Sequence, residues 1–245
     1  MMASTSVPGK VSSCVIGFDV WGTLLNLEKV LETIGNRVAK CTGMSIDRAL
    51  ALVFKVHEEA KEIRRRNPEM GAHGILETSK KLLASTFKIR VEDVENLIET
   101  AFAEVHVKVL YEDVIEALNT LNNLGIKMGV VGNVLFWPSK YTRFLLENLG
   151  ISKYFRSFMF SDEVGVSKPD RKIFLLFAES MGVDPSRIIY VGDNIVEDVG
   201  GPLSAGGFGV LISRSSNKWV CVPELKVALI NRLTELPGVY EVFCK

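Results

Sequence analysis

Acidic residues follow two short apolar segments, at places where their side chains could act together. Asp19 comes directly after the apolar residues 13–18, Asp193 follows the apolar residues 188–191 with one glycine between, and Asp198 stands five positions further on. A carboxylate can attack an electrophile or ligate a hard cation such as Mg²⁺. Taken singly, each of these aspartates also has an ordinary structural explanation as a turn or helix-capping residue.

A lysine stands in a comparable place. Lys168 lies in the segment Ser167-Lys168-Pro169, just before a helical pattern. A proline near a helix start is common, and the lysine could simply be solvated. An ammonium group beside carboxylates would, however, supply the positive charge that an anionic substrate needs.

The surrounding elements bring these residues together. Apolar runs with turn residues after them predict strands at residues 13–18, 126–131 and 188–191, with two more at 157–160 and 209–212. Helical patterns at 114–123, 139–149 and 172–181 alternate with the strands. This alternation predicts an α/β fold with a Rossmann-like, doubly wound parallel sheet. Ligands bind at the carboxyl ends of such strands, where the acids and the lysine would converge.

Residues 27–110 break the alternation. They hold no convincing strand but four successive helix-period segments, which begin near residues 27, 46, 75 and 91. A helical insert directly after the first strand would cover the carboxyl edge of the sheet as a cap. We therefore expect a disordered tail at 1–10, a catalytic core at 11–25 plus 112–245, and an all-helical cap domain at 26–111.

Three motifs in this order resemble those of the haloacid dehalogenase-like hydrolases. They are Asp-x-x-Gly-Thr-Leu at 19–24, Lys-Pro at 168–169 and Gly-Asp-x-x-x-x-Asp at 192–198, and the likeness covers residues 11–25 and 112–212. The resemblance implies that Asp19 is the nucleophile and that Lys168 neutralises it and the phosphoryl oxygens. It implies a Mg²⁺ held by Asp19, the Trp21 carbonyl and Asp193, with Asp198 in the outer shell. It also implies a phosphatase that acts on a small-molecule phosphate through an aspartyl-phosphate.

Two positions depart from the family pattern. Trp21 stands where the phosphatases carry an aspartate that protonates the leaving group, so that acid is missing or comes from elsewhere. Gly132 stands where a serine or threonine hydroxyl would bind phosphate. We expect Gly132 and Asn133 to bind the substrate instead, through backbone N–H groups or the Asn133 amide.

Trp21 also leaves two alternatives open. Metal-independent 2-haloacid dehalogenases of the same superfamily resemble this chain in having an aromatic residue there, since a halide leaves without a proton. They differ in the last motif, where Gly192-Asp193 keeps a metal-binding acid. The second alternative is a non-catalytic binding protein on the same fold.

Composition argues against some classes of partner and site. Lys plus Arg equals Asp plus Glu at 29 each, which argues against a nucleic-acid partner, and no apolar run approaches the roughly 20 residues of a membrane helix. We expect a cytoplasmic monomer or homodimer. No metal-ligand spacing is found among the cysteines, at 14, 41, 221 and 244, or among the histidines, at 57, 73 and 106. We therefore expect the cysteine thiols to be free and inert.

Three segments near the expected cap bear on the substrate. Arg64-Arg65-Arg66 could recognise a second anionic group, or could form a solvated helix end. Residues 70–74 are expected to form a flexible loop. Phe136 and Trp137 would line the entrance or pack beneath the cap.

Overall fold

The computed structural model describes residues 13–105 and 107–245, and its centre is a seven-stranded sheet with the order β3-β2-β1-β4-β5-β7-β6. The expected tail at 1–10 and His106 lie outside the described residues. All neighbouring strands run parallel except β6 and β7. The strands are β1 (Val15–Phe18), β2 (Lys127–Gly132), β3 (Phe155–Phe160), β4 (Ile188–Gly192), β5 (Phe208–Ile212), β6 (Val220–Val222) and β7 (Val227–Ile230).

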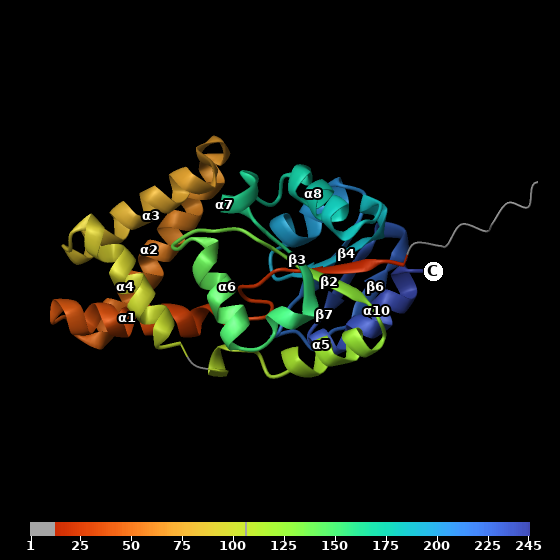
Figure 1. Ribbon diagram of the computed structural model, residues 1–245, viewed down its shortest axis with the longest axis horizontal. Coiled ribbons are helices and arrows are strands. Elements are labelled where there is room, and N and C mark those ends of the chain that lie inside the picture. The colour runs from red at the N-terminus through yellow and green to blue at the C-terminus, as the bar shows by residue number, and fades with distance from the viewer. Residues whose placement is uncertain (1–12, 106) are drawn as a thin grey trace, which may run out of the picture.

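The central strands are buried because helices cover both faces of the sheet. Every residue of β1 and β4 is buried, which explains why they read as unbroken apolar runs. Helix α8 (Arg171–Met181) covers one face, and α5 (Val114–Asn123) and α10 (Leu236–Phe243) cover the other (Figure 1). Helix α6 (Ser139–Asn148) follows β2, while α7 (Ser161–Val164) and α9 (Gly201–Ser204) are short. The predicted doubly wound α/β fold is thus confirmed.

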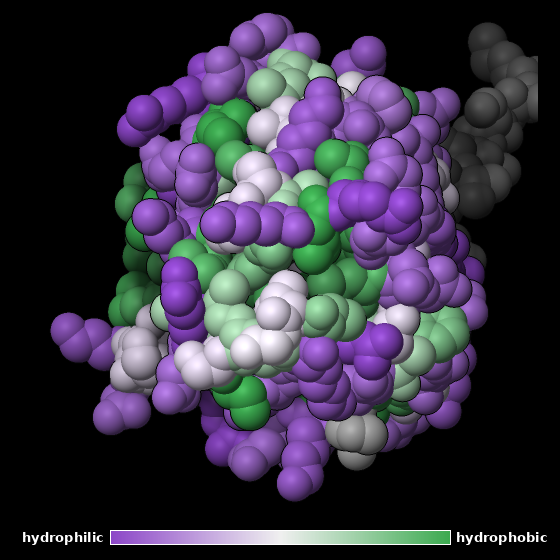
Figure 2. Space-filling view, turned by 90° about the vertical axis from the view of Figure 1, so that its left-hand side faces the viewer, coloured by the Kyte–Doolittle hydropathy of each residue, from purple (hydrophilic) through white to green (hydrophobic). Residues whose placement is uncertain are grey.

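The helical insert forms a separate layer beyond the carboxyl edge of the sheet (Figure 1). Its helices are α1 (Leu27–Thr42), α2 (Ile46–Arg66), α3 (Gly71–Phe87) and α4 (Val91–Ala103). We call α1–α4 the helical cap. The apolar stripes of the helices face one another. Figure 2 shows that hydrophilic residues surround this end of the molecule, with hydrophobic and intermediate residues at its centre. The exact domain boundaries remain a prediction.

Two expectations were wrong. Residues 71–74 are not a flexible loop, because α3 already begins at Gly71 and packs Ala72 against the bundle. The thiols are not all free either, since Cys14 and Cys244 form a disulfide. The start of β1 and the end of α10 lie side by side, which no spacing in the sequence shows. None of the helices in the described ranges has the length and apolar character needed to cross a membrane.

Candidate active site

Asp19 lies at the carboxyl end of β1, where parallel strands bring their ends to one edge of the sheet. Its N–H donates to the Val191 carbonyl oxygen at 2.9 Å, which fixes it beside the end of β4. The residue is 8% exposed, so the carboxylate faces a nearly closed space. The chain then turns at Gly22, whose φ of +85° lies in the left-handed region that favours glycine.

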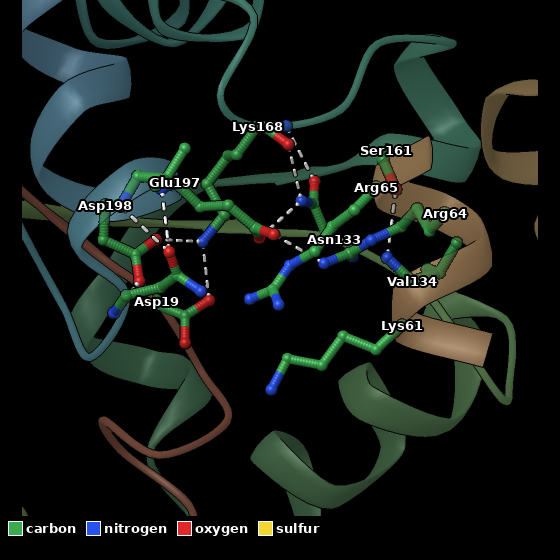
Figure 3. Close-up of polar contacts among 12 residues, drawn as sticks. Asp19, Lys61, Arg64, Arg65, Asn133, Val134, Ser161, Lys168, Glu197 and Asp198 are labelled. Carbon is green, nitrogen blue, oxygen red and sulfur yellow. Dashed lines mark hydrogen bonds and ion pairs between the residues drawn. The ribbon is translucent and has the colours of Figure 1, made fainter. Parts of the chain in front are cut away.

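Lys168 reaches the same place from the loop between α7 and α8 (Figure 3). Its Nζ donates to Oδ1 of Asp19 at 2.7 Å, to Oδ1 of Asp198 at 2.6 Å and to the Tyr190 hydroxyl at 2.9 Å. The Tyr190 hydroxyl donates in turn to the Val131 carbonyl oxygen at 2.5 Å. An ammonium group has three N–H donors, so every one is used and the group is held in a single position.

Asp193 follows β4 directly, and Asp198 lies in the short π-helical segment Ile195–Gly200 after it; both approach Asp19. One oxygen from each of the three carboxylates lies within 4.8 Å of the others. Asp198 is buried, and both its oxygens are bonded, one to Lys168 and one to the Asn194 N–H at 3.0 Å. In the described part of the chain no lysine or arginine pairs with Asp193. Asp193 therefore keeps free oxygens beside Asp19, whereas Asp198 holds Lys168.

This cluster of three carboxylates and one ammonium is short of positive charge. Burial raises the pKa of Asp19 from 3.8 to about 8 against the attraction of Lys168. Asp193 is exposed, but partial desolvation of its carboxylate and the charge of Asp198 raise its pKa to about 6. Burial alone would lower the pKa of Lys168. The attraction of the Asp19 and Asp198 carboxylates is stronger than this effect, and it holds the pKa of Lys168 well above its ordinary value. The lysine is thus charged at neutral pH, and it alone does not neutralise its acidic neighbours.

Gly132 is the last residue of β2, and the ring of Phe160 fills the space beside it. A Cβ atom at Gly132 would lie 2.8 Å from the Phe160 ring, which leaves no room for a serine or threonine side chain. The next residue, Asn133, accepts from the Lys168 N–H at 2.8 Å and donates to the Lys168 carbonyl oxygen at 2.9 Å. Its Nδ2 also donates to Glu197 at 2.9 Å. The Asn133 amide is therefore engaged with protein groups and positions the backbone of Lys168.

A cavity of about 120 Å³, which we call the inner cavity, lies beside Asp19 between the sheet edge and the cap. Trp21, Phe136 and Trp137 line it from the sheet side, and the rings of Trp21 and Trp137 meet edge to face at 5.2 Å. Trp137 also packs against Phe102 of the cap at 5.0 Å. The aromatic residues thus do both things expected of them, because they line the cavity and pack beneath the cap.

The cap contributes one face of helix α2 to the inner cavity. His57, Lys61 and Arg64 line it at successive turns of this helix. His57 is buried against the Phe136 ring at 5.1 Å, and burial lowers its pKa. Arg64 donates to Glu197 at 2.6 Å, whereas the Lys61 ammonium extends toward the side of the cavity where Asp19 lies (Figure 3).

Tyr190 and Glu197 belong to the site but were not predicted. Tyr190 carries a signal, because a tyrosine within a wholly buried strand needs a partner for its hydroxyl. Glu197 carries none, since its partners Arg64 and Asn133 are 133 and 64 residues away in the sequence. Contacts over such separations follow only from the tertiary fold.

Comparison with known proteins agrees with this geometry. The family model described as haloacid dehalogenase-like hydrolase matches residues 15–206, which hold all three motifs. The chain belongs to the haloacid dehalogenase-like hydrolases. A solved haloacid dehalogenase-family phosphatase from Thermococcus onnurineus matches with a TM-score of 0.64 and 28% identity, over 92% of this chain and 97% of that one.

Three further proteins resemble the chain, two in sequence and one in structure. Glyceraldehyde 3-phosphate phosphatase from Methanopyrus kandleri is 38% identical over 107 residues, 42% of this chain and 43% of that protein. Phosphoglycolate phosphatase from Escherichia coli is 36% identical over 85 residues, 35% of this chain and 32% of that protein. L-2-haloacid dehalogenase from Xanthobacter autotrophicus shares the fold, with a TM-score of 0.70 and 17% identity over 94% of this chain and 99% of that one. The chain thus spans less than half the length of these two phosphatases, while the likeness to the solved structures covers nearly the whole chain.

Proposed function

We propose that this hydrolase is a magnesium-dependent phosphatase that cleaves a small-molecule phosphate through an aspartyl-phosphate on Asp19. The observation that carries the proposal is the Asp193 carboxylate, which lies beside Asp19 without a cationic partner among the described residues. A metal-free dehalogenase has no use for such an acid. The dehalogenase alternative is therefore supported by Trp21 alone.

The donor set fits magnesium, which prefers oxygen ligands. The ion would be held by Asp19, Asp193 and the Trp21 carbonyl oxygen. Asp198 would remain in the outer shell, where it binds the Lys168 ammonium. The carbonyl oxygens of Val20 and Leu25 accept backbone hydrogen bonds within the turn. Among the described residues, no hydrogen bond is made to the Trp21 carbonyl oxygen. When bound, the ion would supply positive charge that stabilises the phosphoryl oxygens.

The residues of the chain would carry out the reaction in two steps. The Asp19 carboxylate attacks phosphorus, and the bond to the ester oxygen breaks with its electron pair on the leaving group. Lys168 fixes the orientation of Asp19 through their 2.7 Å contact and stabilises the phosphoryl oxygens. Water then hydrolyses the aspartyl-phosphate and restores Asp19. The cap and the aromatic residues of the inner cavity exclude bulk water.

The phosphatase names of the relatives support the same reaction class. The relatives matched from Methanopyrus kandleri and Escherichia coli are named for glyceraldehyde 3-phosphate and phosphoglycolate, both small phosphate esters. The inner cavity, at about 120 Å³, suits a phosphoryl group with the start of its leaving group. We propose that the substrate belongs to this class of small phosphate monoesters.

A panel of aryl, acyl and alkyl phosphates and 2-haloacids, assayed with magnesium and with chelator, tests the proposal. We expect turnover of phosphates with magnesium only, and a loss of about a thousand-fold or more in Asp19→Asn. Asp193→Asn should mimic chelation. Full-rate dehalogenation in chelator would establish the dehalogenase instead, and binding without turnover of any substrate would favour a non-catalytic protein.

A further inference from the structure

A partly buried ion pair joins the helical cap to the core. Nη2 of Arg64, on α2, donates to Oε1 of Glu197 at 2.6 Å, and the two side chains are 17% and 13% exposed. In the described ranges one other ion pair joins these parts, Lys140 with Glu95 at 2.8 Å, but its side chains are 59% and 52% exposed. Exposed pairs contribute little, while shielded ones attract more strongly. The Arg64–Glu197 pair is therefore the stronger electrostatic link between cap and core.

This link continues to the catalytic lysine. The second Glu197 oxygen, Oε2, accepts from Asn133 Nδ2 at 2.9 Å. Asn133 bonds both backbone polar groups of Lys168, at 2.8 Å and 2.9 Å. Figure 3 shows the continuous path from Arg64 through Glu197 and Asn133 to Lys168, whose ammonium holds Asp19.

The pair also lies where two cavities meet, together with Lys168 and Asn194. The inner cavity of about 120 Å³ adjoins an outer one of about 750 Å³, lined by Met70 and Ile75 of the cap and Pro169 of the core. Arg64 and Glu197 line both cavities. Because Arg64 belongs to the cap and Glu197 to the core, any movement of the cap away from the sheet must break their contact.

We infer that Glu197 is a positioning residue that couples docking of the cap, through Arg64, to the placement of Lys168. With Arg64 docked, Glu197 is held by its partner charge and keeps Asn133 against the Lys168 backbone. With Arg64 withdrawn, the carboxylate loses that partner and Asn133 loses its support. The lysine is then fully ordered only when the cavity is closed. The catalytic consequence rests on the proposed phosphatase function, but the coupling itself does not.

Amide hydrogen exchange at Lys168 tests the coupling without any substrate. The Lys168 N–H donates to Asn133, so a looser Asn133 exposes it. We expect Arg64→Met and Glu197→Gln each to speed its exchange about ten-fold or more, and Arg64→Lys to restore part of the protection. Glu95→Gln, which removes the exposed pair, is the matched control and should change nothing. Unchanged exchange in folded Arg64→Met would overturn the inference.

Kinetics on an aryl phosphate with magnesium supply the second test. We expect Arg64→Met and Glu197→Gln each to lower kcat about ten-fold with little change in KM, and the double variant to be no worse than either. Losses that multiply in the double variant would mean that the two residues act separately. A raised KM in Arg64→Met alone would make Arg64 a substrate ligand, contrary to the inference. If the unmodified protein cleaves no phosphate ester, the proposed function fails, and the exchange measurement alone decides the coupling.

Discussion

A Cβ atom on Gly22 would lie 2.4 Å from Oδ2 of Asp193. The turn after the first strand and the loop after β4 are thus packed together without room for a methyl group. Gly192 shows the same closeness to Asp198, with 2.3 Å from its added Cβ to Oδ2. The glycines of the first and last motifs are therefore required by the acids of the last motif.

Replacing Gly22 by alanine should displace the Asp193 carboxylate and weaken magnesium binding. We expect about a ten-fold or greater rise in the dissociation constant, measured by calorimetric titration of magnesium. Gly125→Ala is the matched control, because Gly125 has a φ of +72° but nothing within 4 Å of its added Cβ. Both variants carry the backbone strain of about 1–3 kcal/mol, so equal magnesium affinities in the two would contradict the prediction.

Much of the fold and of the acidic cluster was predictable from the sequence. Buried parallel strands such as β1 and β4 are apolar throughout, and the acids after them converge because parallel strands end at one edge. Strands β6 and β7 were missed, since they have three and four residues and are partly exposed. The Arg64–Glu197 contact and the Cys14–Cys244 disulfide depend on how distant segments dock, which no local pattern encodes.

The raised pKa values predict an unusual pH dependence of stability for the metal-free protein. The pKa of Asp19 rises to about 8 and that of Asp193 to about 6 on folding, so the folded state binds protons more tightly than the unfolded state. The resulting stabilisation is complete below the unfolded value near 4 and is lost as the pH rises through about 6 to 8. Thermal unfolding from pH 5 to 8.5, in chelator, should therefore show a falling Tm.

Magnesium should reduce this fall, because the cation stabilises the ionised carboxylates. Asp19→Asn is the control in chelator and should show a flatter profile, since its largest titrating group is gone. A metal-free Tm that rises over the same window in the unmodified protein, but not in Asp19→Asn, would contradict the assigned direction of the pKa shift.

The disulfide between Cys14 and Cys244 should make the free energy of unfolding depend on the redox state of the protein. Cys14 and Cys244 are 230 positions apart, so their bond closes almost the whole described chain into one loop. Constraining so long a loop in the unfolded state is worth about 5 kcal/mol in the chain-entropy model. Cys14→Ser/Cys244→Ser should unfold at lower denaturant concentration than the oxidised protein, and a reductant should have no further effect on it. Cys41→Ser, at an exposed free cysteine, should behave like the unmodified protein.

Among the described residues, the inner cavity has no free carboxylic acid that could replace the one absent at Trp21. The acids that line it are Asp19, Asp193, Asp198 and Glu197. The first three form the charged cluster, and Glu197 already accepts from Arg64 and Asn133. His57 also lines the cavity, but burial lowers its pKa, which keeps it neutral and a weak donor at neutral pH.

The leaving group must then depart largely as its anion, so rates should depend steeply on its acidity. With magnesium present, aryl and acyl phosphates should react at least roughly a hundred-fold faster than alkyl phosphates, because general acid catalysis is typically worth 10²–10⁴-fold. Trp21→Asp should flatten this dependence, while Trp21→Phe, which loses the same indole packing on Trp137 without adding an acid, should leave it steep. A series of esters that spans several units of leaving-group pKa measures both slopes. A flat profile in the unmodified protein would show that another group donates the proton, and His57→Gln would then be the variant to compare.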